Sequence, residues 1–122
     1  MSSCLYVMRH GIAVDVGEKG VTCDRDRMLS DEGRQKTRSV ARGLKNILDG
    51  KISRIVCSPY QRALETAEIV AECLDPGIAV EPVDEFSCGE EVQAQLHWLR
   101  KQPAETLLLV GHMPELACLT SS

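Results

Sequence analysis

The sequence predicts an α/β fold with a mainly parallel sheet, because short apolar runs alternate with longer stretches of helical periodicity. The expected strands cover residues 5–8, 55–57, 78–83 and 107–110. The first, second and fourth are apolar throughout, as is typical of strands covered on both faces. Helical stretches separate all four, so the predicted order is βαβαβαβ with right-handed crossovers.

Three helices are predicted from the apolar spacing and from the residues at their ends. The first follows Ser30, a good N-cap, has Asp31 and Glu32 in its first turn, and ends near residue 48. The second is expected over 59–74 and the third over 90–101. Their apolar stripes are Val40, Ala41, Leu44, Ile47 and Leu48; Ala63, Ala67, Val70, Ala71 and Leu74; and Val92, Leu96 and Leu99.

Composition excludes several classes of function. The 122 residues fit a single domain over 1–122, and the net charge of −4 offers no broad attraction to nucleic acid. No apolar run approaches the ~18 residues of a membrane helix, and the first apolar run is too short and too poorly flanked to predict a secretory signal. Six cysteines without a C-x-x-C pair predict no zinc site and favour a reducing cytoplasm. Cys57, next to the expected pocket, is interpreted as an inert core residue.

Basic residues and glycines follow three of the predicted strands. Arg9, His10 and Gly11 come directly after the first strand, Arg62 falls in the first turn of the second helix, and His112 follows the last strand. Taken singly, such an arginine is usually a solvated charge and such a histidine an ordinary hydrogen-bonding residue. Because the carboxyl ends of parallel strands meet at one edge of a sheet, together they predict a site for a phosphoryl group.

These motifs resemble those of the histidine phosphatase superfamily, the phosphoglycerate mutase-like group named for its R-H-G motif. The resemblance implies a three-layer α/β/α sandwich. Within that superfamily the chain is most similar to the SixA-type phosphohistidine phosphatases, although that branch usually has proline where Met28 stands. The mutase branch has asparagine where this chain has Val16. The matching residues are Arg9-His10-Gly11, Ala13, Arg27-Met28-Leu29-Ser30, Gly33, Ser58-Pro59, Arg62-Ala63, Thr66-Ala67 and Gly111-His112.

The resemblance implies that His10 attacks phosphorus and becomes a covalent phosphohistidine, without a metal or other cofactor. Arg9, Arg62 and His112 would surround the phosphoryl oxygens, and their charge would keep His10 unprotonated. Gly11 and Ser58 are further expected to contact the phosphate. A glutamate after the third strand serves as general acid in other branches, which makes Glu85 a candidate and Asp84 its competitor. Glu90 and Glu91 are instead expected in the first turn of the third helix.

Short connections predict an open site that admits a phosphohistidine on a phosphorelay domain of another protein. Two alternatives stay open at this point: a phosphatase of small phosphate esters, and a module that binds phosphate or phosphoprotein without turnover. The connection over residues 14–28 is either a solvated loop or a lid over the site.

The carboxyl-terminal residues carry a separate expectation. Members of the family continue through a helix and a further strand, and residues 115–119 are expected to begin that helix. Either the chain is a shortened version, or its sheet is completed by fewer strands or by another molecule. Uncovered strand edges would favour self-association.

Overall fold

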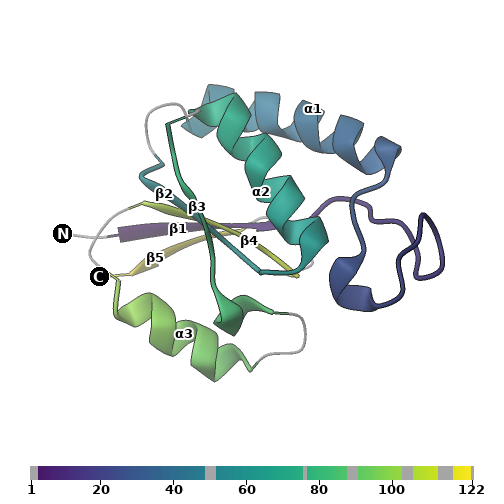
Figure 1. Cartoon of the computed structure of the whole chain (residues 1–122). Coiled ribbons are helices and arrows are strands. Elements are labelled where there is room, and N and C mark those ends of the chain that lie inside the picture. The colour runs from purple at the N-terminus through teal and green to yellow at the C-terminus, as the bar shows by residue number, and fades with distance from the viewer. Residues whose placement is uncertain are drawn as a thin grey trace.

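The computed structural model confirms the α/β architecture (Figure 1). It describes residues 3–48, 52–75, 77–87, 91–102, 106–112 and 117–121. Helices α1 and α2 cover one face of the sheet and α3 covers the other (Figure 1). The main elements are β1 (Ser3–Arg9), α1 (Asp31–Leu48), β2 (Arg54–Cys57), α2 (Gln61–Leu74), β3 (Val80–Pro82), α3 (Val92–Arg100), β4 (Leu107–Gly111) and β5 (Ala117–Ser121).

The strand order within the described residues is β3-β2-β4-β1-β5. The first four strands of that order run parallel, and the registers pair Arg9 with Gly111 and Cys57 with Val110. Strand β4 therefore lies between β1 and β2. This arrangement brings the carboxyl ends of the three strands that precede the predicted site residues side by side.

The carboxyl-terminal expectation was wrong. Residues 117–121 form strand β5, which pairs antiparallel with β1 and sets Leu5 opposite Leu119, whereas residues 115–119 were expected to begin a helix. Residues 115 and 116 lie outside the described part of the chain. An unpaired edge of β1 would expose backbone donors and acceptors, and pairing with β5 satisfies them. Because this stabilisation comes from pairing between distant segments of the chain, the local helical periodicity could not predict it.

The alternation of side chains along the strands divides the core between the two faces of the sheet. Ile55, Cys57 and Leu108 pack toward α1 and α2, while Val56 and Leu109 pack with α3 and its neighbours. Each central strand is thus buried on both faces, as its uniformly apolar sequence predicted. The second cluster includes an edge-to-face contact between Phe86 and Trp98 at 5.5 Å.

Helix α1 buries a narrower stripe than its sequence predicted. Ala41 and Leu44 are buried, but Val40 and Ile47 are 49% and 65% exposed. Ala41 and Leu44 lie on the same side of the helix as the buried Gly33 and Thr37, whereas Val40 and Ile47 lie on the adjacent side. Helical spacing identified both sides, but only the packing of α1 determines which of them is covered.

The helix ends are close to those predicted. Ser30 does cap α1, since its Oγ accepts the backbone N–H of Gly33 at 2.9 Å. Helix α2 begins at Gln61, two residues later than expected. Helix α3 begins at Val92, so Glu91 lies just before the helix and not in its first turn as predicted. Residue 90 is outside the described part of the chain.

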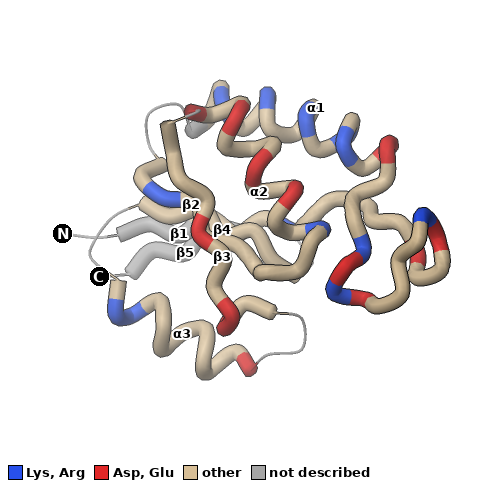
Figure 2. The backbone as a smooth tube through the Cα atoms, viewed as in Figure 1, with Lys and Arg blue, Asp and Glu red and all other residues tan. Residues whose placement is uncertain are grey.

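Along α1 the acidic residues lie in the first turn and only Lys and Arg follow them, whereas charges of both signs alternate over residues 14–28 (Figure 2). No helix in the described part of the chain has the length and apolar character needed to cross a membrane.

Candidate active site

Backbone hydrogen bonds extend the sheet by one residue at two strand ends and thereby place the candidate side chains. The N–H of His10 donates to the carbonyl of Gly111 at 3.0 Å, and the N–H of Ser58 donates to the carbonyl of Val110 at 3.0 Å. His10 and Ser58 consequently flank the end of β4, where His112 follows. The rings of His10 and His112 are 5.2 Å apart between centroids.

Hydrogen bonds assign the two nitrogens of the His10 ring. Nδ1 lies 2.7 Å from the carbonyl oxygen of Gly11, and a carbonyl can only accept, so Nδ1 carries the proton. In the neutral ring Nε2 then has a free lone pair. The Nε–H of Arg62 points at that lone pair from 3.3 Å. The arrangement presents a nucleophilic nitrogen next to a guanidinium.

The charge state of His10 agrees with this assignment. Burial lowers the pKa of His10, and the positive charges of Arg62, Arg9 and Arg27 lower it further, against the raising effect of the hydrogen bond to Gly11. The ring is therefore neutral at neutral pH. An unprotonated imidazole is the form that can attack an electrophile.

Ser58 and Tyr60 hold the ring of His112 in place. Its Nε2 lies 3.0 Å from Ser58 Oγ, which also accepts the backbone N–H of Tyr60 at 3.1 Å. A serine hydroxyl can both donate and accept, so Ser58 Oγ can pair with His112 Nε2 in either tautomer of the neutral ring. Burial, followed by the charges of His10 and Arg62, lowers the pKa of His112 to about 4.

Ser58 and Gly11 were predicted to contact phosphate, but both already have protein partners. The hydroxyl of Ser58 pairs with His112, and the N–H of Gly11 donates to Thr66 Oγ1 at 3.0 Å. Thr66 Oγ1 in turn donates to the carbonyl of Arg62 at 2.7 Å. A Cβ on Gly11 would come within 2.5 Å of Thr37 Oγ1, so a glycine is needed there for close packing. Within the described contacts these residues orient the others.

The sequence did not predict the partners of Arg62. Its side chain is almost fully buried, and its Cζ lies over the Tyr60 ring, 5.2 Å from the ring centroid. Nη1 donates to the backbone carbonyl of Asp24 at 2.8 Å, and Nη2 donates to Asp24 Oδ2 at 3.2 Å. Asp24 belongs to the connection over residues 14–28, for which the sequence left both a solvated loop and a lid open. The only sequence signal available was an acidic residue in the connection that follows the His10 strand.

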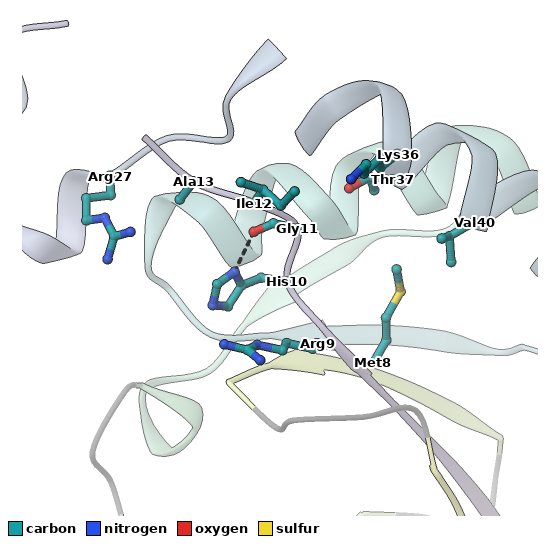
Figure 3. A pocket seen from close by; sticks show the side chains of 10 residues that line it. All are labelled: Met8, Arg9, His10, Gly11, Ile12, Ala13, Arg27, Lys36, Thr37 and Val40. Carbon is teal, nitrogen blue, oxygen red and sulfur yellow. Dashed lines mark hydrogen bonds between the residues drawn. The ribbon is translucent and has the colours of Figure 1, made fainter. Parts of the chain in front are cut away.

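A cavity of about 530 Å³ opens beside His10 and extends toward α1 (Figure 3). Arg9, which is exposed, and Arg27 both line it, and Figure 3 shows the Arg9 guanidinium beside the His10 ring. Arg62 and His112 do not line this cavity and reach His10 from α2 and from the end of β4. The lining residues are Met8, Arg9, His10, Gly11, Ile12, Ala13, Arg27, Lys36, Thr37 and Val40.

The two acid candidates lie in a short 3-10 helix over Asp84–Phe86, directly after β3. Glu85 is half-buried and Asp84 is exposed. The described contacts include no hydrogen bond or ion pair from either carboxylate to His10, Arg62 or His112. Among the described residues, no group of three or more His, Cys, Asp and Glu side chains is arranged to hold a metal ion.

Cys57 is fully buried at the end of β2, as predicted for a core residue. Burial raises the pKa of its thiol to about 12, with a smaller contribution from Glu68. The thiol is therefore protonated and unreactive at neutral pH.

Known proteins resemble this chain in sequence and in fold. A sequence model of the histidine phosphatase superfamily (branch 1) matches residues 5–104. The phosphohistidine phosphatase SixA of Escherichia coli is 31% identical over 121 residues, which cover 96% of this chain and 71% of that protein. An uncharacterized protein of Picosynechococcus is 36% identical, covering 92% of this chain and 67% of its own length. The structure of the protein histidine phosphatase SixA complexed with tungstate superimposes with a TM-score of 0.74 at 29% identity, covering 91% of this chain and 70% of the other.

Proposed function

Because this chain belongs to the histidine phosphatase superfamily, we propose that it is a phosphatase that removes the phosphoryl group from a phosphohistidine of another protein, through a phosphoryl intermediate on His10. The observation that carries the proposal is the fixed ring of His10. Its Nδ1–H is bound to the Gly11 carbonyl, and the Arg62 Nε–H stands at the free Nε2.

The first step transfers the phosphoryl group to His10. Nε2 attacks phosphorus and forms a P–N bond, while the P–N bond of the substrate breaks and the departing imidazole takes a proton from solvent. Arg62, Arg9 and His112 stabilise the negative charge on the phosphoryl oxygens. The fixed donors of a guanidinium suit a loose transition state whose charge is spread over three oxygens.

The second step returns the enzyme to its starting state. Water attacks phosphorus and the bond from phosphorus to His10 Nε2 breaks. The proton from water passes to the inorganic phosphate that leaves. The low pKa of His10, caused first by burial, makes its imidazole available again for the next cycle at neutral pH.

Two features support a protein-bound phosphohistidine as substrate. The relative whose name states this activity matches nearly the whole chain. Arg9 is exposed, and His10 and His112 are only partly buried, so a side chain from another protein can reach Nε2. A P–N bond also breaks with less help from an acid than an alkyl ester does, which fits a site in which Glu85 makes no described contact to the other residues.

The test compares the wild type with His10→Ala and His97→Ala, without added metal, on a phosphorylated histidine-containing domain and on p-nitrophenyl phosphate. His97 is exposed on α3 and serves as the matched control. We expect the wild type and His97→Ala to release phosphate and to form an acid-labile phosphoenzyme, and His10→Ala to do neither.

Equal release of phosphate by the wild type and His10→Ala would refute the enzymatic proposal. Turnover of p-nitrophenyl phosphate alone would indicate a phosphatase of small esters. Phosphate binding without turnover of either substrate would indicate a binding module.

A further inference from the structure

Asp24 makes a two-point contact with Arg62, the cation next to the candidate nucleophile. The backbone carbonyl of Asp24 accepts from Nη1 at 2.8 Å, and its Oδ2 accepts from Nη2 at 3.2 Å. The Arg62 side chain is 5% exposed and that of Asp24 is 51% exposed. A surface carboxylate thus reaches inward to a buried guanidinium.

This contact uses one edge of the guanidinium and leaves the adjacent edge facing His10. Nη1 and Nη2 form the edge that faces Asp24. The adjacent edge consists of Nε–H and the second N–H of Nη2, and its Nε–H points at His10 Nε2 from 3.3 Å. A phosphoryl group on that nitrogen would meet two parallel donors of Arg62, which is the bidentate geometry that arginine offers to phosphate.

Asp24 is itself fixed by the loop that carries it, residues 14–28. Its Oδ1 accepts from Arg27 Nη1 at 2.9 Å, and Arg27 Nε donates to the carbonyl of Val14 at 2.7 Å. The N–H of Val14 donates to the carbonyl of Met28 at 2.9 Å, which closes the base of the loop. Hydrogen bonds from Arg27 and then from Arg62 lower the pKa of Asp24, so the carboxylate is charged at neutral pH.

A second contact ties the same loop to the other side of Arg62. The guanidinium of Arg25 lies over the Tyr60 ring at 5.4 Å, and Tyr60 also packs against Arg62 and His112. Both attachments lead from the 14–28 loop to the groups that surround His10. The loop therefore borders the site through Asp24 and Arg25, although most of its residues are exposed.

We propose that Asp24 is a positioning residue that holds the Nε edge of Arg62 toward the phosphoryl group on His10. The inference rests on the proposed function for the identity of that group. Without Asp24, Arg62 would keep its charge but would have to be ordered anew in each transition state. The entropy lost in ordering the Arg62 side chain would raise the barrier and slow phosphoryl transfer.

The same contact has an opposite interpretation, in which the carboxylate competes with phosphate for Arg62 and slows the reaction. The two interpretations predict opposite changes in oxyanion binding and in transfer rate when Asp24 is removed. Removing a positioning carboxylate weakens oxyanion binding and slows transfer, whereas removing a competing one strengthens binding and speeds transfer. The Nε edge, which faces His10, favours positioning, because a phosphoryl group on His10 does not need the donors that Asp24 occupies.

The experiment compares Asp24→Ala, Asp24→Asn and the control Asp26→Ala. Asp26 lies in the same short 3-10 helix, and its described hydrogen bond joins its carboxylate to Cys23 and not to the site. Two quantities are measured: the dissociation constant of tungstate by calorimetry, and the single-turnover rate at which His10 is phosphorylated by a phosphohistidine domain. Thermal melting checks that each variant is folded.

We expect Asp24→Ala to weaken tungstate binding and to slow phosphorylation by about 10- to 100-fold, the loss typical of one hydrogen bond between charged groups. Asp24→Asn should recover part of this loss, because its amide oxygen can still accept from Nη2. Asp26→Ala should match the wild type. In an Arg62→Lys background, which lacks the fork, Asp24→Ala should change either quantity by less than about 2-fold.

Binding or transfer by Asp24→Ala that equals or exceeds the wild type would overturn the proposal, as would an undiminished effect in the Arg62→Lys background. The tungstate measurement does not need turnover. If the wild type binds tungstate but never phosphorylates His10, the proposed function is wrong, and the binding constants still decide the role of Asp24.

Discussion

The glycine at position 33 is expected to be irreplaceable, whereas Gly43 in the same helix is expected to be freely substituted. A Cβ on Gly33 would lie 2.1 Å from the backbone oxygen of Ile12 and 3.0 Å from its carbonyl carbon. A Cβ on Gly43 would meet no atom within 4 Å. Both positions are helical, so Gly→Ala brings the same gain in helix propensity at each, and the pair isolates the contact with Ile12.

The cost at Gly33 follows from what holds Ile12 in place. An ordinary contact would require a displacement of about 1.3 Å, and the atom that must move is backbone, with no rotamer to change. The carbonyl of Ile12 accepts the N–H of Ser30 at 2.9 Å, so the displacement breaks a hydrogen bond at the start of α1. Overpacking and a lost hydrogen bond together cost about 3 kcal/mol.

Urea unfolding, followed by the fluorescence of the single tryptophan Trp98 and by circular dichroism, measures both variants. We expect Gly33→Ala to lose about 3 kcal/mol of unfolding free energy, and Gly43→Ala to gain about 0.5 to 1 kcal/mol. Gly33→Ala should also weaken tungstate binding, because Ile12 follows the Gly11 carbonyl that orients the His10 ring. A Gly33→Ala protein within about 0.5 kcal/mol of the wild type would refute the reasoning.

Three further outcomes are expected. Because the pKa of His112 falls from 6.5 to about 4 in the folded protein, the unfolded chain binds more protons than the folded one between these pH values. The free energy of unfolding should therefore be highest above pH 6.5 and fall by about 3 kcal/mol toward pH 4. In urea titrations, His112→Asn should flatten this dependence on pH. If Glu85 is the general acid, Glu85→Gln should slow hydrolysis of an alkyl phosphate by about 10²-fold and spare phosphohistidine, while Asp84→Asn changes neither; equal effects of the two variants would exclude that role. Iodoacetamide should alkylate the exposed Cys23 and leave Cys57 unmodified in mass spectra of the native protein, whose buried thiol has a pKa of about 12; a labelled Cys57 would contradict its burial.

The parts of the site that could be predicted from sequence are those set by regular structure. Apolar runs identified the strands, and the residues that follow them had to emerge at one edge of a parallel sheet. His10, Arg62 and His112 were brought together in this way, and the pairing of β1 and β2 with β4 confirms the neighbourhood. The inert interpretation of Cys57 also followed from its place at the end of an apolar strand.

The parts that could not be predicted depend on contacts between segments without a shared period. The contact of Asp24 with Arg62 spans 38 positions and starts in a loop whose alternating charges resemble a solvated surface. Strand β5 forms because β1 offers an open edge, and no local sequence pattern predicts that edge. The exposure of Val40 and Ile47 depends in the same way on what packs against α1, not on the helix itself.

The backbone of Gly11 links the candidate nucleophile to the helix that carries Arg62. The carbonyl of Gly11 holds Nδ1 of His10, and its N–H binds Thr66, which binds the carbonyl of Arg62. The nucleophile and the neighbouring turn of α2 are thus both held by hydrogen bonds to the same residue. A flexible histidine and a flexible arginine would have to be ordered separately in each transition state. Because backbone hydrogen bonds and buried packing do this ordering in the folded protein, the site can stay open at its surface without losing its precision.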